Sequence, residues 1–251
     1  MKIENSKIIN FRRQVWAYYR NDGRNKLPWR KTKDPYKILV SEIMLQQTQV
    51  PRVIEKYKEF LKAFPTVHHL ARAPLATVLR VWSGMGYNRR AKFLRDAAKI
   101  IVEKHDGRVP LVYSELIELP GVGDYTASAV RVFAFNKPDV LIETNIRAAI
   151  IYHFFADTLT IRDRVILVYA EKAAQRQDPR EWHWALMDYG AHIKKIHGNP
   201  SRRSAHYTRQ SKFEGSLRQV RGAILRSLAA GDQINGLRNR YKERFDKALE
   251  G

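Results

Sequence analysis

One carboxylate stands in an otherwise apolar stretch near the start of the chain, and its surroundings suit it to proton transfer. Glu42 lies among Ile, Val, Leu and Met side chains in a predicted helix over residues 36–47, with Ile38 and Gln46 four positions to either side on the same face. Such a carboxyl should be partly desolvated, which raises its pKa and suits it to donate a proton near neutral pH. The alternative is a helix-face glutamate that pairs with a nearby arginine or lysine.

A second candidate site is a glycine-containing turn, LPGVGDYT at residues 119–126. The pattern predicts a short helix over 112–119 and a longer one over 125–135. Two glycines one residue apart allow a tight turn with positive φ and let another backbone approach closely. The second helix then begins with amide groups and the positive end of its dipole facing outward, which favours an anion. The alternative is a plain turn between packed helices.

The overall charge indicates which anion to expect. The 251 residues include 46 Lys and Arg against 25 Asp and Glu, a formal charge of +21. This excess indicates a polyanionic partner, with nucleic acid ahead of an anionic membrane surface. No apolar run reaches the length of a membrane span, and residues 1–10 lack a signal-peptide core. We therefore expect a soluble, cytoplasmic, DNA-associated protein with no membrane partner.

Helical signals dominate the chain, and no convincing alternating strand is present, so the predicted class is all-α. Asp34-Pro35 starts a helix in the favoured way, with a capping side chain followed by proline at the first helical position. Basic residues outnumber acidic ones in the C-terminal part, where two helices are predicted over 217–228 and 237–249.

Five segments, taken in order, carry a resemblance to a known family. They are LPWR at 27–30, SEIMLQQTQV at 41–50, GMGY at 84–87, LPGVGDYT at 119–126 and ALMDYGA at 185–191. Together they resemble the helix-hairpin-helix (HhH-GPD) DNA glycosylases that include endonuclease III, and most closely the adenine, MutY-type branch. The glycine turn alone is shared by many DNA-binding proteins, whereas the MLQQTQ run after Ser-Glu is much more specific to the adenine branch.

The resemblance implies roles for two glutamates. Glu42 would protonate the purine ring so that adenine can leave. Glu143, in Glu-Thr-Asn with Asn145, lies where the family has an Asp-Gly-Asn-like sequence, whose Asp stabilises the cationic sugar and positions the attacking water. Glu143 is one methylene longer than that Asp, so its reach changes. The other reading is structural, with Glu143 favouring the N-terminus of a helix.

The resemblance also assigns residues that contact DNA. Tyr125 replaces the lysine that forms a Schiff base in bifunctional members, which implies a monofunctional enzyme without lyase activity. Gln46 and Gln47 would enter the duplex beside the extruded base, and Tyr87 would act as a wedge, with a core aromatic as its alternative. Arg30 would hold the catalytic helix or face the pocket. In the hairpin, the residues expected to hold the DNA backbone are Gly121, Val122, Gly123 and Thr126, and the carbonyls of residues 119–122 could bind a monovalent cation.

The sequence departs from the family in two places. The family usually carries a cysteine-ligated iron–sulfur cluster after the MDYGA helix, but this chain contains no cysteine, so we expect no cluster and no other cofactor. The histidines that follow lack a compact ligand spacing for another metal. Packing and hydrogen bonds would replace the cluster, with Arg202, Arg203 and Lys212 available for phosphate. We also expect no 8-oxoguanine-recognition domain like that of the adenine branch, and instead a small basic helical extension or a solvated basic arm.

These features predict a two-lobed, monomeric protein with a catalytic cleft between the lobes. The expected domains are a helical barrel module over 27–135, a discontinuous lobe of 1–26 and 136–212, and a basic extension over 213–251. The expected reaction is hydrolysis of the N-glycosidic bond of a flipped base in double-stranded DNA, adenine opposite guanine or 8-oxoguanine. The alternatives are a mismatch thymine or uracil glycosylase, or a non-catalytic lesion-binding protein of the same fold.

Overall fold

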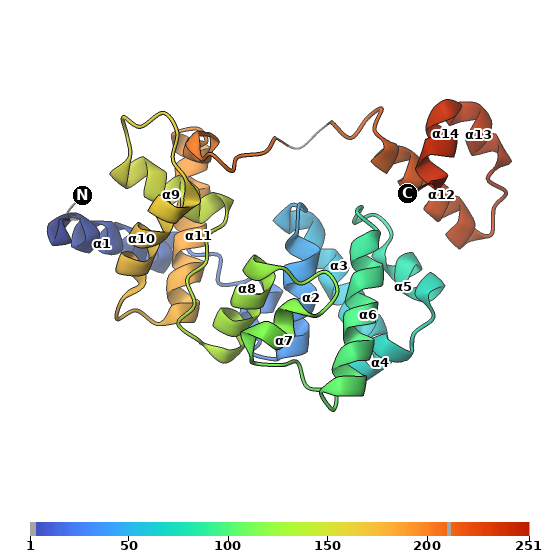
Figure 1. Cartoon of the computed structure of the whole chain (residues 1–251), viewed down its shortest axis with the longest axis horizontal. Coiled ribbons are helices and arrows are strands. Elements are labelled where there is room, and N and C mark those ends of the chain that lie inside the picture. Colours follow the sequence, from blue (N-terminus) through green and yellow to red (C-terminus); the bar gives the residue numbers. More distant parts are fainter. Residues whose placement is uncertain (1–3, 210–211, 251) are drawn as a thin grey trace. The chain divides into compact units, whose positions relative to one another are not determined.

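The computed structural model describes residues 4–209 and 212–250, so residues 1–3, 210–211 and 251 of the expected domains lie outside it. Within the described ranges the chain is helical, and the only β pairing is an isolated bridge between Ile161 and Ser204 (Figure 1). The all-α prediction is therefore confirmed. No helix of the described residues is long and apolar enough to cross a membrane.

The chain forms two compact units, and each is discontinuous in sequence. Unit 1 consists of Met1–Ile38 and Gly123–Thr208, and unit 2 of Leu39–Val122 and Arg209–Gly251. Residues 27–38 and 123–135, which we expected in the barrel module, thus belong to unit 1, and the C-terminal helices belong to unit 2. This grouping reflects contact density, and the expected domain boundaries stay a prediction.

Unit 1 is built on two long helices that pack against α9. Its elements are α1 (Asn5–Asp22), the 3-10 helix η1 (Pro28–Lys31), α8 (Asp124–Phe135), α9 (Thr144–Phe154), α10 (Asp163–Ala174), α11 (Pro179–Ile196) and η2 (Pro200–Arg203). α11 packs along α9 and α1, and its buried face carries Trp182, Ala185, Leu186 and Tyr189. Gly190 permits the close approach of these helices, because a Cβ there would stand 1.9 Å from the carbonyl oxygen of Asn145 on α9.

Unit 2 begins within α2 (Pro35–Leu45), which starts as predicted. Asp34 caps it, with the Tyr36 backbone N–H donating to Asp34 Oδ1 at 2.9 Å. The unit continues with α3 (Val50–Ala63), α4 (Val67–Arg72), α5 (Leu75–Trp82), α6 (Arg89–Lys104) and α7 (Tyr113–Ile117). α6 packs on α4 and α5. Its buried stripe of Ala91, Leu94, Ala97, Ala98 and Ile101 follows the helical period.

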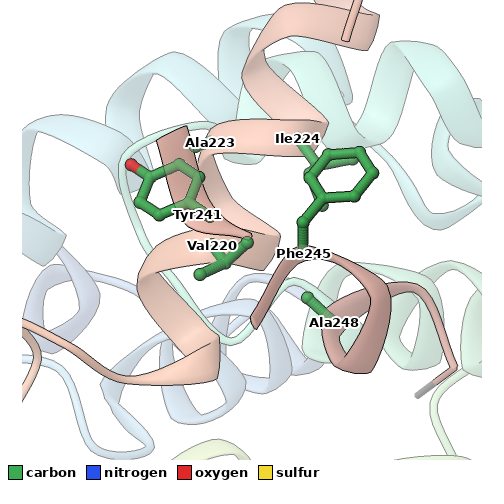
Figure 2. Packing of buried hydrophobic residues seen from close by; sticks show 6 residues of the cluster. All are labelled: Val220, Ala223, Ile224, Tyr241, Phe245 and Ala248. Atoms are coloured by element: carbon green, nitrogen blue, oxygen red, sulfur yellow. The ribbon is translucent and has the colours of Figure 1, made fainter. Parts of the chain in front are cut away.

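The C-terminal part of unit 2 is a folded three-helix element, which we call the C-terminal module. It comprises α12 (Leu217–Ala230), α13 (Asn235–Tyr241) and α14 (Glu243–Leu249). Figure 2 shows its core, formed by Val220, Ala223, Ile224, Tyr241, Phe245 and Ala248. A solvated basic arm is therefore the wrong reading of these residues. The single helix predicted over 237–249 is also wrong, because Lys242 adopts φ 47° and separates α13 from α14, so that Tyr241 and Phe245 both enter the core.

Candidate active site

Glu42 lies in unit 2, one turn before the C-terminal end of α2. The residue is 6 % exposed, and its neighbours Val40, Ile43 and Met44 are buried. The predicted apolar environment of this carboxyl is therefore present. Its catalytic role stays a prediction, because burial alone also fits a structural group.

The chain directly after α2 carries the two predicted DNA-contacting glutamines. Gln46 is partly buried, and its amide Nε2 donates to the carbonyl oxygen of Gly121 at 3.2 Å. Gln47 is exposed and adopts φ 55°, a left-handed conformation that costs a non-glycine residue about 1 kcal/mol or more. One glutamine therefore reaches the glycine turn of the hairpin, and the next stands outward on a strained backbone.

Tyr87 shares this unusual backbone geometry. It follows the Gly84-Met85-Gly86 turn with φ 47°, and its side chain is half-buried. A half-buried ring is compatible with the wedge and with its alternative, so the wedge role stays a prediction. Two of the three residues expected to enter the duplex, Gln47 and Tyr87, have left-handed backbones, and strain of this kind collects at functional sites.

Arg90 connects the two strained segments, and the sequence analysis did not single it out. Its Nη1 donates to the carbonyl oxygens of Ile43 at 2.9 Å, Met44 at 2.9 Å and Gln46 at 2.5 Å. Its Nη2 donates to Thr48 Oγ1 at 2.9 Å and to the carbonyl oxygens of Met85 at 3.4 Å and Gly86 at 3.2 Å. Burial lowers the pKa of this guanidinium to about 10, so it stays charged at neutral pH.

With one planar group, Arg90 thus donates to carbonyl oxygens at the C-terminal end of α2 and in the Gly84-Met85-Gly86 turn. Cations stabilise the carbonyl end of a helix, and the fork of donors in arginine suits several acceptors at once. The signal that could have found it is its register, since Arg90 lies one turn before Leu94 and two turns before Ala97 on the apolar stripe of α6. A charged residue in that stripe has to be paired with internal acceptors.

The hairpin between α7 and α8 contains two glycines with different requirements. Gly121 has φ +79°, and a Cβ there would stand 2.9 Å from the Cβ of Phe93, so the fold itself demands glycine. Gly123 precedes α8 with φ −101°, and a Cβ there would meet nothing within 4 Å. The predicted positive φ therefore applies to the first glycine only, and the second leaves open space before the helix N-terminus.

The side chains of Val122 and Thr126 are 6 % and 3 % exposed. A DNA contact of the hairpin would consequently come from backbone groups, while these two side chains anchor the turn. The Leu119 carbonyl accepts from Val122 N–H at 3.0 Å and the Gly121 carbonyl from Gln46. The monovalent-cation site predicted at these carbonyls stays a prediction.

Glu143 lies in unit 1, as does Tyr125, and it caps α9. Its Oε1 accepts from the backbone N–H groups of Asn145 at 2.8 Å and Ile146 at 2.9 Å, and its Oε2 accepts from Asn145 Nδ2 at 3.1 Å. The structural reading of Glu143 at a helix N-terminus is thus correct, and the extra methylene provides the reach. Burial raises the pKa of the Glu143 carboxyl, while the two N–H donors and the charge of Lys194 act in the opposite direction.

Lys194 on α11 completes this arrangement, and the sequence analysis did not assign it a role. Its Nζ donates to Asn145 Oδ1 at 3.1 Å. The bond leaves the amide nitrogen of Asn145 directed at Glu143, so Lys194, Asn145 and Glu143 form a chain of contacts. The lysine lies just beyond the MDYGA motif, where no sequence signal separates it from the exposed Lys195.

The LPWR and MDYGA segments are joined by charged hydrogen bonds. Asp188 of the MDYGA segment accepts from Arg30 through both carboxylate oxygens, at 2.7 and 2.8 Å, and from the backbone and side chain of Arg24. Burial opposes ionisation of Asp188, but the hydrogen bonds and charge of Arg30 outweigh it and lower the pKa. The Arg30 side chain is 4 % exposed and holds η1 against α11 through Asp188, and its role beside the catalytic helix or the pocket stays a prediction.

The segment that would carry a cluster in the family contains several hydrogen bonds, and the expected absence of a cofactor stays a prediction. Asn199 caps η2 by accepting from Ser201 N–H at 3.2 Å. Arg203 donates to the carbonyl oxygens of Phe155 at 2.8 Å and Ala156 at 2.5 Å beyond α9, whereas Arg202 and Lys212 are exposed. The phosphate role predicted for these three residues stays a prediction. Over residues 4–209 and 212–250, no group of three His, Cys, Asp or Glu side chains could hold a metal ion.

Comparison with known proteins agrees with the all-α fold. The model of the HhH-GPD superfamily base excision DNA repair proteins matches residues 40–171, and the chain belongs to this family.

Three relatives show how the similarity is distributed. An adenine DNA glycosylase of Buchnera aphidicola subsp. Baizongia pistaciae is 38 % identical over 187 residues, covering 73 % of this chain and 52 % of the relative. A thymine-DNA glycosylase of Aeropyrum pernix is 35 % identical over 184 residues, covering 73 % and 77 %. The solved structure of a thermostable thymine-DNA glycosylase superposes with a TM-score of 0.67 at 28 % identity, covering 74 % of this chain and 87 % of that one. The chain thus matches about half the length of the Buchnera protein.

Proposed function

We propose that the protein is a monofunctional DNA glycosylase that removes adenine from mispairs with guanine or 8-oxoguanine. The observation that carries the proposal is the arrangement around α2: a buried Glu42, followed within five residues by the exposed and strained Gln47 and joined through Arg90 to Tyr87. Glu42, the proposed proton donor, lies on the same unit as the two groups proposed to enter the duplex, which supports the proposal. The adenine glycosylases among the relatives support the choice of base.

In the proposed reaction, Glu42 donates a proton to the purine ring, the bond between the base and the sugar breaks, and the electron pair leaves with adenine. The sugar becomes an oxocarbenium-like cation, which the Glu143 carboxylate stabilises before water adds and releases one proton to solvent, forming an abasic site. Asn145 and Lys194 hold Glu143 in place. Tyr125 has no amine, so no Schiff base with the sugar forms and the strand stays intact.

DNA would be held mainly through its phosphates. The excess of positive charge supplies affinity, and backbone amides at the start of α8 supply a fixed anion position beside Gly123. Exposed Arg202 and Lys212 would add phosphate contacts. The partner in this proposal is double-stranded DNA, bound by a monomer inside the cell, and the reaction needs neither an iron–sulfur cluster nor another cofactor.

A mismatch thymine or uracil glycosylase is the second candidate. The thymine-DNA glycosylase of Aeropyrum pernix favours it, because the match covers 77 % of that protein's length. The similar structure of a thermostable thymine-DNA glycosylase favours it as well. In such an enzyme the Glu42 carboxyl would face a pyrimidine, whose departure gains less from ring protonation. The two candidates therefore predict different dependence on Glu42.

The test uses duplexes with a single A:8-oxoG, A:G, T:G or U:G pair, incubated with the full chain and then divided. One half is heated in alkali and the other is not. Cleavage of an adenine-containing strand only after alkali is the expected result, and Glu42→Gln should abolish it. Cleavage of only the T:G or U:G duplexes would establish the second candidate, strand cleavage without alkali would show lyase activity, and no cleavage of any duplex would refute an enzymatic role.

A further inference from the structure

The C-terminal module is attached to unit 2 next to Tyr87. α12 packs against α5, the helix that leads into the Gly84-Met85-Gly86 turn. Ser216 caps α12 by accepting from Gln219 N–H at 3.3 Å, and Arg221 Nε donates to the carbonyl oxygen of Ala248 on α14 at 3.2 Å. With the core seen in Figure 2, these contacts give the start of α12 a fixed position.

Arg218, in the first turn of α12, reaches from the module to Tyr87. Its Nη1 donates to the Tyr87 hydroxyl, and its Cζ lies 5.0 Å from the centroid of the Tyr87 ring. The Cζ of Arg90 lies 5.4 Å from the same centroid. Two guanidinium groups therefore hold one half-buried ring, and cation–π contacts of this kind contribute at both exposed and desolvated sites.

The two arginines differ in origin. Arg90 belongs to α6, and it binds the carbonyl oxygens of Gln46 and Gly86, which directly precede the two strained residues. Arg218 belongs to the module, and the contacts given for it above are to the hydroxyl and ring of Tyr87. The backbone before Tyr87 is therefore bound by α6, whereas its ring is contacted by both α6 and α12.

We propose that Arg218 is a positioning residue through which the C-terminal module orients Tyr87 and thereby sets the preference for the base opposite the extruded nucleotide. This rests on the proposed function, since it takes Tyr87 as the group that enters the duplex. A ring held at its hydroxyl and its face can adopt few orientations, so it fits some opposite bases better than others. Without Arg218 the ring loses the partner of its hydroxyl and one of its two cation–π contacts, so it is held less firmly and discriminates less.

The experiment measures binding, so that it does not depend on excision. Duplexes carry a stable abasic analogue opposite each of the four bases, and the ratio of the tightest to the weakest dissociation constant is determined. The wild type is compared with Arg218→Met, Arg218→Lys and the control Arg226→Met, an exposed arginine of the same helix. Thermal unfolding and circular dichroism of each variant establish that the module remains folded.

We expect Arg218→Met to reduce the ratio about three- to tenfold, corresponding to the loss of one cation–π contact and its hydrogen bond. Arg218→Lys should restore part of the ratio. Arg226→Met removes the same charge and should weaken binding to all four duplexes alike, leaving the ratio within about twofold. In a Tyr87→Ala background, Arg218→Met should change the ratio no further.

An unchanged ratio in Arg218→Met, an equal change in Arg226→Met, or an undiminished effect of Arg218→Met in the Tyr87→Ala background would overturn the inference. Failure of the proposed function looks different. If the wild type excises no base but the ratio still depends on Arg218 and Tyr87, the inference stands and the enzymatic proposal falls. If bases are excised but the ratio does not depend on Arg218, the enzymatic proposal stands and the inference falls.

Discussion

The two glycines of the hairpin offer a matched pair of substitutions that separates folding from DNA binding. Alanine at Gly121 has to adopt φ +79° and place its Cβ 2.9 Å from that of Phe93. The left-handed conformation alone costs about 1–2 kcal/mol. Alanine at Gly123 adopts φ −101°, which any residue tolerates, and its Cβ meets nothing within 4 Å.

The expected stabilities follow from these geometries. Gly123→Ala loses a little as a helix-capping position and gains about 0.4–1 kcal/mol from a less flexible unfolded chain, so its free energy of unfolding should change by less than about 0.5 kcal/mol. Gly121→Ala should lower that free energy by about 2–5 kcal/mol, the sum of the backbone cost and the cost of overpacking against Phe93. Urea unfolding followed by tryptophan fluorescence measures both.

For the affinity for DNA we expect the opposite order, with the larger effect from Gly123→Ala. A methyl group at Gly123 stands before the first amides of α8, where a phosphate oxygen would approach. Loss of one charge-assisted hydrogen bond costs about 1.5–3 kcal/mol, equivalent to roughly 10- to 150-fold weaker binding. Fluorescence anisotropy with a duplex containing an abasic analogue measures this, with Gly121→Ala examined below its unfolding transition. If Gly123→Ala binds as tightly as the wild type, or is itself unfolded, the hairpin is a packing turn and the phosphate assignment is wrong.

Three further substitutions or conditions test the remaining contacts. Arg90→Met should lower the free energy of unfolding by about 3–5 kcal/mol, because several carbonyls of α2 and of the Gly84-Met85-Gly86 turn lose their donor. The control Lys104→Met, at an exposed residue of the same helix, should change it by less than about 0.5 kcal/mol. Equal effects of the two substitutions in urea unfolding would contradict the role of Arg90. Glu143→Gln should reduce single-turnover excision about 100- to 1000-fold with a change in stability under about 1 kcal/mol, and full activity would show that Glu143 is only a cap. Burial lowers the pKa of His183 to about 4, and its Nε2 accepts from Leu141 N–H at 3.1 Å, so the folded state binds this proton less readily than the unfolded chain. Stability should be full above about pH 6.5 and fall toward pH 4, and unfolding curves of His183→Gln should depend less on pH over that range, which an unchanged slope would disprove.

The sequence predicted the helices well where a cap or breaker marks their ends. Asp34-Pro35 and the apolar run after it identified α2, and the register of that helix placed Glu42 in apolar surroundings. The two helices of the hairpin were recognisable because two glycines lie between them. Local chemistry dominates at all of these places, and it is visible in a single sequence.

Contacts between distant segments were beyond such reasoning. Arg90 donates to carbonyl oxygens near the end of α2, more than forty positions away in the sequence. Lys194 on α11 likewise donates to Asn145 on α9. Nothing local distinguishes Arg90 from the exposed Arg89 except its register on α6. Lys242 could not be identified as a break either, because its left-handed backbone arises from packing Tyr241 and Phe245 into one small core.

The interleaving of the two units has a consequence for the order of folding. During synthesis, unit 1 can close once residues up to about 208 have emerged, whereas the face of α5 that receives α12 stays uncovered until the last helices follow. Contacts between such distant segments form slowly, and uncovered apolar faces promote aggregation. In a ribosome-bound chain that lacks the C-terminal module, unit 1 should therefore be folded and unit 2 incomplete, and Tyr87 should not yet contact Arg218.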